Sequence, residues 1–125
     1  MAVVLIADDD MDIRSIARDY LTAMGFDAHV AANGAEALEQ MELLKPDVLV
    51  LDLSMPRIDG WDVARRIRQN PQLRHTRILA FTAHAFKSDE EKAREAGCDA
   101  YLSKPFVPEA LLEQVQRLLK PPDPP

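Results

Sequence analysis

The stretch Val48-Leu49-Val50-Leu51-Asp52 is a short, unbroken apolar run that ends in a carboxylate. Three further segments end in a similar way, with Asp8 and Asp9 after Val3–Ala7, Thr82 after Ile78–Phe81, and Lys104 after residues 101–103. Unbroken apolar runs of this length are typical of parallel strands that are covered on both faces. The carboxyl ends of such strands lie along one edge of the sheet, where open α/β folds bind ligands. The sequence therefore predicts that these polar side chains meet at one edge.

Helical periodicity fills the spaces between the apolar runs. Apolar residues recur at three- and four-residue steps in segments that begin near Asp10, Asn33, Trp61 and Pro108, and a capping signal at Ser88 indicates one more helix. Residues 26–32 add a weaker strand candidate and residues 100–103 a short one. Five strands that alternate with five helices imply right-handed crossovers and helices on both faces of the sheet. We therefore predict a doubly wound, three-layer α/β sandwich, (βα)5, with a five-stranded parallel sheet in the order 2-1-3-4-5.

Several of the predicted helix ends have recognisable capping signals. Asp10 and Asn33 are expected N-caps, and Ser88 begins an S-x-x-E capping box that is expected to open the fourth helix. Gly25 and Gly97 stand where a helix C-terminus favours left-handed backbone. These signals place the helix boundaries between the apolar runs.

The composition is that of one globular domain. The chain has 125 residues, of which 47% are hydrophobic and 29% are charged. We expect a single domain over residues 1–120 and a proline-rich tail or linker stub over residues 121–125. The formal net charge of −6 argues against nucleic acid as a direct partner, because surfaces that bind phosphate backbones are basic.

The sequence has no signal for a membrane or for export. No apolar stretch approaches the ~20 residues that span a bilayer, and the N-terminus lacks the basic region and cleavage site of a secretion signal. Cys98 is the single cysteine, so an intramolecular disulfide is excluded and we expect it to pack as a small hydrophobic residue. We therefore predict a cytoplasmic protein that has no membrane partner.

The three carboxylates of Asp8, Asp9 and Asp52 indicate a metal site. In the predicted strand order the first and third strands are neighbours, so the three groups would be crowded together and would repel one another. Formally they contribute −3 and Lys104 contributes +1, so that one divalent cation neutralises the cluster. Hard oxygen ligands favour Mg²⁺, or Mn²⁺, over zinc.

The same residues suggest a phosphorylation reaction. Asp52 is the best candidate for the nucleophile, because it stands alone on the central strand while Asp8 and Asp9 form a pair suited to a metal ion. A carboxylate can attack phosphorus and form an aspartyl phosphate. Lys104 would stabilise charge on the transferring oxygens, and Thr82 could donate a hydrogen bond to the phosphoryl group.

The sequence resembles the receiver domains of two-component response regulators, over nearly the whole chain from Val3 to about Leu119. The resemblance rests on four motifs in the expected order: I-A-D-D-D, L-D-L-S-M-P-R-I-D-G, F-T-A and Y-L-S-K-P-F. It implies the flavodoxin-like form of the doubly wound fold. It also implies that Asp52 accepts a phosphoryl group from a phosphohistidine of a histidine kinase or histidine phosphotransferase.

The resemblance implies a role for each residue of the site. Mg²⁺ would be bound by Asp9, Asp52 and the backbone carbonyl of Ser54, with Asp8 assisting through water. Lys104 would contact the phosphoryl group, and the Lys104–Pro105 bond would be cis. Thr82 and Tyr101 would be a switch pair that alters the surface of the fourth helix, fifth strand and fifth helix. His84, two residues beyond Thr82, would obstruct attacking water or lie on the surface, and Val107 lacks the polar side chain that often caps the last helix.

The expected function is regulatory, and the chain would catalyse only its own phosphorylation and dephosphorylation. We expect a stand-alone response regulator that contacts a downstream protein or acts in a phosphorelay, as a monomer or a phosphorylation-dependent dimer. The alternative is a receiver domain cut from a larger regulator or hybrid histidine kinase. Two other classes fit less well. One is a phosphohydrolase with an aspartyl nucleophile, which would use two aspartates of a D-x-D motif after the first strand, whereas Asp52 lies elsewhere; the other is an interaction module that is not phosphorylated.

Overall fold

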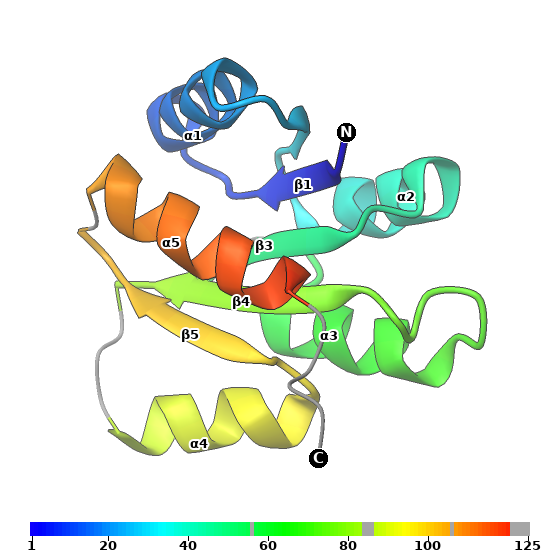
Figure 1. Cartoon of the computed structure of the whole chain (residues 1–125). Coiled ribbons are helices and arrows are strands. Elements are labelled where there is room, and N and C mark those ends of the chain that lie inside the picture. The colour runs from blue at the N-terminus through cyan, green and yellow to red at the C-terminus, as the bar shows by residue number, and fades with distance from the viewer. Residues whose placement is uncertain (56, 84–86, 106, 121–125) are drawn as a thin grey trace, which may run out of the picture.

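The computed structural model describes residues 1–55, 57–83, 87–105 and 107–120. Strands and helices alternate along this part of the chain (Figure 1). In order, they are β1 (Val3–Ala7), α1 (Met11–Ala23), β2 (Asp27–Ala31), α2 (Gly34–Leu44), β3 (Val48–Asp52), α3 (Gly60–Gln69), β4 (Arg77–Thr82), α4 (Lys87–Ala96), β5 (Ala100–Ser103) and α5 (Pro108–Leu119). None of the helices described is long and apolar enough to span a bilayer.

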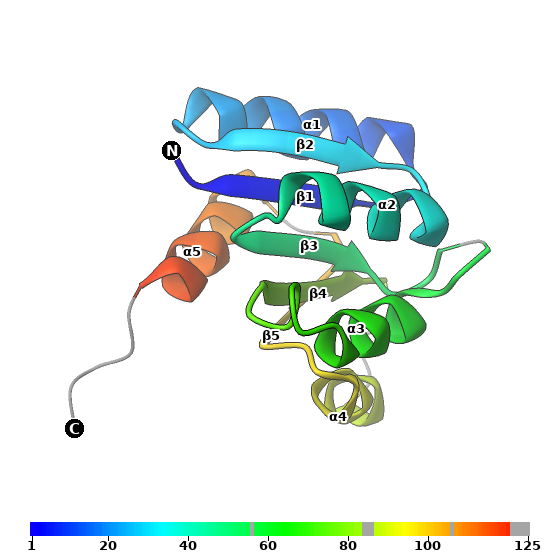
Figure 2. The same ribbon diagram turned by 90° about the vertical axis from the view of Figure 1, so that its right-hand side faces the viewer.

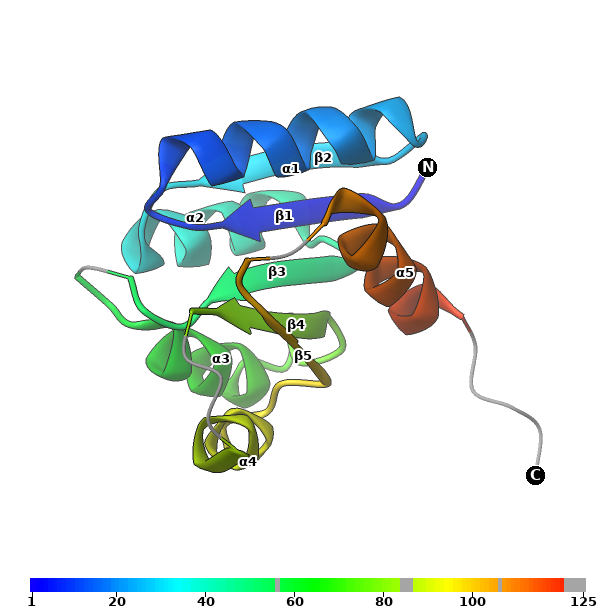
Figure 3. The ribbon, with the colours of Figure 1, turned by 90° about the vertical axis from the view of Figure 1, so that its left-hand side faces the viewer.

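The strands form one parallel sheet in the order β2-β1-β3-β4-β5, as the sequence predicts. β3 lies at the centre, where Leu51 pairs with Ala7 of β1 and with Ala80 of β4. Helices cover both faces of this sheet (Figures 2 and 3). The three-layer α/β sandwich is therefore confirmed, and all strands end on the same side of the molecule.

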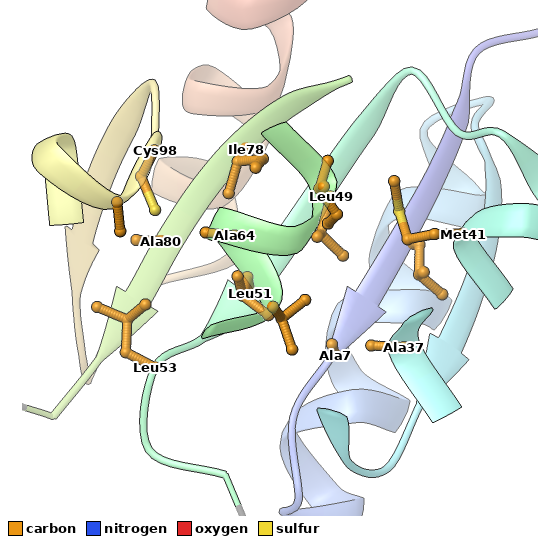
Figure 4. Packing of buried hydrophobic residues seen from close by; sticks show 14 of the residues in the cluster. Ala7, Ala37, Met41, Leu49, Leu51, Leu53, Ala64, Ile78, Ala80 and Cys98 are labelled. Carbon is orange, nitrogen blue, oxygen red and sulfur yellow. The ribbon is translucent and has the colours of Figure 1, made fainter. Parts of the chain in front are cut away.

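The core consists of two clusters, one on each face of the sheet. Alternate residues of each strand point to opposite faces, so that Leu49 joins one cluster and Val50 the other. The first cluster contains apolar side chains of α2, α3 and α4, and Cys98 packs within it as a small hydrophobic residue (Figure 4). The second contains side chains of α1 and α5, including Leu21 and Leu111. Both faces of β3 are buried, which explains its unbroken apolar run.

Most of the predicted helix ends are confirmed. The Asp10 carboxylate accepts from the backbone N–H of Asp12 and Ile13, and Asn33 caps α2. Gly25 and Gly97 have φ of 96° and 108°, the left-handed backbone expected after a helix. Val107 provides no side-chain cap for α5, as its apolar side chain predicts, and Pro108 is the first residue of that helix.

One prediction about a helix boundary needs correction, and one helix cap was not predicted. Ser88 does not precede α4 but is its second residue, since the helix begins at Lys87. Asp89 and Glu90 lie in the first turn, where the positive end of the helix dipole stabilises acidic side chains. A serine followed by acidic residues is therefore also compatible with the interior of the first turn. The N-cap of α3 is Asp59, whose carboxylate accepts from the N–H of Asp62; the sequence analysis assigned it no role.

Candidate functional site

The polar residues at the strand ends converge at one edge of the sheet. Asp52 is the last residue of β3 and Thr82 the last of β4, while Asp8 directly follows β1. The carboxylates of Asp8, Asp9 and Asp52 each offer an oxygen, and these atoms all lie within 4.8 Å of one another. The predicted acidic cluster is therefore present.

The three carboxylates have different surroundings. Asp8 is buried and Asp52 is 3% exposed, whereas Asp9 is exposed. Asp8 Oδ1 accepts from the backbone N–H of Asp10 at 2.9 Å, and Asp52 Oδ1 accepts from the N–H of Ser54 at 3.0 Å. The Asp9 carboxylate makes no hydrogen bond with any other described residue. It is the member of the cluster that is most available to a ligand from solvent.

Lys104 joins the two buried carboxylates. Its Nζ donates to Asp8 Oδ2 at 2.7 Å and to Asp52 Oδ2 at 3.2 Å. It also lies 4.7 Å from the centre of the Phe81 ring, which limits its contact with water. The backbone N–H of Lys104 donates to the Thr82 carbonyl at 2.8 Å, and the Lys104–Pro105 bond is cis. The amine predicted to handle phosphoryl charge thus lies beside the predicted nucleophile.

Burial and the neighbouring charges alter the ionisation of this cluster. Burial raises the pKa of Asp52 to about 6, and the charge of Asp8 adds to this, although the Ser54 N–H and Lys104 oppose it. Burial lowers the pKa of the Lys104 amine, but its hydrogen bond to Asp8 and the negative charges of Asp52 and Asp8 outweigh this, and the pKa is raised. Lys104 therefore stays charged while Asp52 ionises near neutral pH.

Two close backbone contacts hold the loops around Asp52. A Cβ on Gly60 would overlap the Asp52 carbonyl oxygen and lie 2.5 Å from the Leu53 Cα, so only glycine lets α3 begin here. On the β1–α1 side, Arg14 donates from Nη1 to the Asp8 carbonyl at 2.9 Å. The role of Arg14 was not predicted. Its hydrogen bond joins a helix to the end of a strand, and no local sequence pattern indicates such a contact.

Thr82 and Tyr101 lie on the same face of the sheet. Ala80 pairs with Tyr101 across β4 and β5, and Thr82 is two residues further along β4, so the three side chains share a face. Thr82 is buried, and Tyr101 is partly buried against the cluster of α2, α3 and α4. Burial, with the charges of Asp89 and Glu90, raises the pKa of the Tyr101 hydroxyl. The role of Thr82 and Tyr101 as a switch pair stays a prediction.

An apolar groove opens beside the acidic cluster. It has a volume of about 440 Å³ and lies between α1 and the segment that joins β5 to α5. Its lining residues are Ile13, Ile16, Ala83, Lys104, Pro105 and Pro108. Ile16 is 56% exposed although it lies on the apolar stripe of α1, so this stripe extends beyond the core to the surface. His84 lies outside the described residues.

The acidic cluster fits a hard divalent cation. Its donors are carboxylate oxygens, the ligands that Mg²⁺ and Mn²⁺ prefer. An oxygen of the Asp9 carboxylate, which forms no hydrogen bond with another described residue, lies within 4.8 Å of an oxygen of each of the other two. Ser54 lies at the site, because its N–H contacts Asp52. The ligand role of its carbonyl stays a prediction.

Comparison with known proteins agrees with this geometry. The sequence model described as the response regulator receiver domain matches residues 4–116. The chain belongs to this family. It is 32% identical over 118 residues to the polar-differentiation response regulator DivK of Brucella anthropi, which covers 94% of this chain and 95% of that protein. The predicted resemblance is therefore confirmed.

Solved receiver structures have the same fold. The chemotaxis protein CheY4 of Vibrio cholerae superimposes with a TM-score of 0.91 at 34% identity, covering 95% of this chain and 99% of that one. The receiver domain of a signal transduction histidine kinase from Syntrophus aciditrophicus superimposes with a TM-score of 0.87 at 28% identity, covering 95% and 90%. The flavodoxin-like fold is confirmed, and the chain is the receiver domain of a two-component response regulator.

Proposed function

We propose that Asp52 is the phosphoacceptor of this receiver domain. The observation that carries the proposal is the contact of Lys104 with both Asp52 and Asp8, because it brings a fixed positive charge to the carboxylate at the end of the central strand. The donor would be a phosphohistidine of a histidine kinase or histidine phosphotransferase. An Asp52 carboxylate oxygen forms a bond to phosphorus as the P–N bond of the donor breaks, and the imidazole leaves with the donor protein.

The other residues of the site would hold the reacting groups in place. Asp9, Asp52 and the Ser54 carbonyl would bind Mg²⁺, or Mn²⁺, with Asp8 acting through water. The cation would supply positive charge to the phosphoryl oxygens. Lys104 would exchange part of its contact with Asp52 for a phosphoryl oxygen, since its ammonium has three donors.

Phosphorylation would be reported at the surface of α4, β5 and α5. The phosphoryl group adds charge and acceptor oxygens beside the end of β4, which would draw the Thr82 hydroxyl inward. Tyr101 shares its sheet face with Thr82 and would move further into the space so vacated. The chain would thus act as a regulatory switch that processes only its own phosphoryl group.

We further propose that the domain is a cytoplasmic, stand-alone regulator that contacts a downstream protein or serves a phosphorelay. The similarity to DivK, which is described as a response regulator, supports the regulatory role. The similarity to a histidine kinase receiver domain keeps the alternative of a larger parent protein. A monomer would suffice for either role, and dimerisation would depend on phosphorylation.

The proposal is tested with acetyl phosphate and Mg²⁺ as a small phosphodonor system. The unmutated chain should gain one phosphoryl group, measured by intact mass, and Asp52→Asn should gain none. Asp62→Asn, in the first turn of α3 and partly exposed, is the matched control and should be labelled like the unmutated chain. Equal labelling of Asp52→Asn and the unmutated chain would show that the acceptor is another residue.

A further inference from the structure

The amino ends of the strands carry a basic surface far from Asp52. Arg77 begins β4 and pairs with Val48, whereas Asp52 pairs with Phe81 at the other end of the same ladder. Figure 2 shows the strands beginning, and α5 ending, on one side of the molecule. Two hollows lie there, of about 430 Å³ and 380 Å³, and residues 75–77 line both. We call this surface the basic edge.

The basic edge has more positive than negative charge. Five lysine and arginine side chains line the two hollows, and the carboxylates there are those of Asp47 and Asp99. Both carboxylates are already engaged by backbone donors: Asp47 accepts from Val3 N–H and Asp99 from Ile78 N–H, each at 2.8 Å. A local excess of three positive charges stands out in a chain of formal net charge −6.

Four of the five cations that line the hollows form no ion pair with a carboxylate of the described residues. Arginines elsewhere form exposed ion pairs with Asp19, Asp62, Glu90 and Glu113. By contrast, no ion pair among the described residues includes any of four cations of the basic edge, which are Lys45, Arg74, Arg77 and Lys120. Their charges are therefore available to an anionic ligand that enters the hollows.

The wall of the smaller hollow is held by the fifth cation, Arg68. Its Nη1 donates to the carbonyls of Arg74 and Thr76 at 2.7 and 2.6 Å, and its Nε donates to Gly97 O at 2.8 Å. Its Nη2 pairs with Asp99 at 2.7 Å. The Arg68 guanidinium thus joins α3 to the loop at residues 74–76 and to the loop at residues 97–99. The backbone that presents Arg74 and Arg77 is therefore fixed before any ligand arrives.

We propose that the basic edge binds a phosphate-bearing small molecule of nucleotide size. Arginine guanidinium groups match the geometry of phosphate oxygens, and the two hollows fall within the range of about 300 to 1,000 Å³ that is typical of ligand sites. Their concave shape favours a small molecule over an extended macromolecular surface. The proposed site is at the opposite end of the strands from Asp52, and it does not depend on the phosphoacceptor role of Asp52.

The test uses ATP and inorganic tripolyphosphate as probes, with the full chain in 150 mM NaCl and EDTA. EDTA keeps divalent cations from carrying the probes to the acidic cluster, and the salt screens non-specific attraction. Calorimetry should show saturable binding, and amide chemical shifts should change at residues 45, 47, 72–77 and 118–120. Binding of ATP by Arg74→Gln/Arg77→Gln should be at least tenfold weaker. Arg18→Gln/Arg94→Gln removes the same charge from exposed ion pairs elsewhere and should stay within twofold.

Four results would overturn the proposal. The first is the absence of saturable binding of either probe, and the second is an equal loss in both double variants, which would indicate attraction by overall charge. The third is a set of shifts centred on residues 8, 9 and 52. The fourth is retention on vesicles with anionic phospholipid but no binding of ATP, which would assign the surface to membranes. Labelling of Asp52 by acetyl phosphate should be unchanged in both double variants, so that failure here is distinct from failure of the phosphoacceptor proposal.

Discussion

Lys104 Nζ lies 2.7 Å from Asp8 Oδ2, and this ion pair is almost entirely removed from solvent, with side-chain exposures of 15% and 0%. The two residues are 96 positions apart in the chain. A buried carboxylate that loses its only cation is left uncompensated, which costs far more than loss of a surface ion pair. We therefore expect the Lys104–Asp8 contact to contribute to the stability of the site.

Replacement of Lys104 should change the ionisation of Asp52. Lys104→Met keeps an apolar stem but removes the charge that opposes the raised pKa of Asp52, so the midpoint should move above its value of about 6. Carbon-13 NMR of the Asp52 carboxyl measures this titration, with EDTA present. Lys104→Arg retains the charge and should titrate much closer to the unmutated chain. A midpoint that is unchanged in Lys104→Met would show that the charge of Lys104 does not lower the pKa of Asp52.

Asp52→Asn should stabilise the folded protein at pH 7.5. The pKa of Asp52 is raised to about 6 in the folded chain, from an ordinary value of 3.8. The cost of ionising Asp52 is therefore fully present above about pH 6, and it is relieved as the pH falls from 6 toward 3.8. We expect a gain of roughly 1 to 3 kcal/mol at pH 7.5, less the hydrogen bonds that asparagine loses. Urea unfolding in EDTA at pH 7.5 and pH 5 measures the gain, which should shrink at pH 5. An equal effect at both pH values would point to packing instead of charge.

Mg²⁺ should stabilise the chain through Asp9. At a concentration ten times the dissociation constant, a ligand that binds only the folded state adds about 1.4 kcal/mol to the free energy of unfolding. Asp9→Asn should lose most of this gain, measured as the rise in the thermal midpoint between EDTA and MgCl₂. Asp12→Asn, in the first turn of α1, is the matched control. The control should keep the full gain, and a gain that survives in Asp9→Asn would show that Asp9 is not a ligand.

Thr82 should transmit the phosphorylated state to Tyr101. Thr82→Val keeps the shape of the side chain but removes the hydroxyl, whereas Thr82→Ser keeps the hydroxyl. Both variants should take up label from acetyl phosphate, but only Thr82→Ser should retain the phosphorylation-dependent shift of the Tyr101 ring resonances. A full shift in the valine variant would exclude the hydroxyl from signal transmission.

The apolar groove beside Lys104 should serve a protein phosphodonor and not a small one. Ile16→Glu places a charge in the groove and should slow transfer from a phosphorylated kinase at least tenfold, equivalent to ~1.4 kcal/mol. Its labelling by acetyl phosphate should stay within twofold. Met24→Glu, at the other end of the same helix and 49% exposed, is the control. Equal slowing with both donors would indicate that Ile16→Glu impairs the phosphorylation site around Asp52 and not the contact with the protein donor.

Local sequence patterns predicted the elements of this fold well. The run Val48–Leu51 is unbroken and apolar because both faces of β3 are buried. The capping residues Asp10 and Asn33 accept hydrogen bonds from backbone groups within three residues of themselves. Such signals operate over a few residues and are legible along the chain. The start of α4 was misplaced because a capping pattern and a favourable first helical turn use the same residue types.

By itself, the sequence determined which residues end the strands, and therefore that Asp8, Asp9, Asp52, Thr82 and Lys104 gather at one edge. Their chemistry as an acidic cluster with a single amine also followed from residue type. Only the tertiary structure decided which partners they and the arginines take: Lys104 contacts Asp8 and Asp52, Arg14 contacts the Asp8 carbonyl, and Arg68 joins two loops. The raised pKa of Asp52 is also set by the tertiary structure, and so is the lack of ion pairs between the four cations of the basic edge and other described residues. Both depend on burial and on distances between distant segments, which are set by the packing of the whole chain.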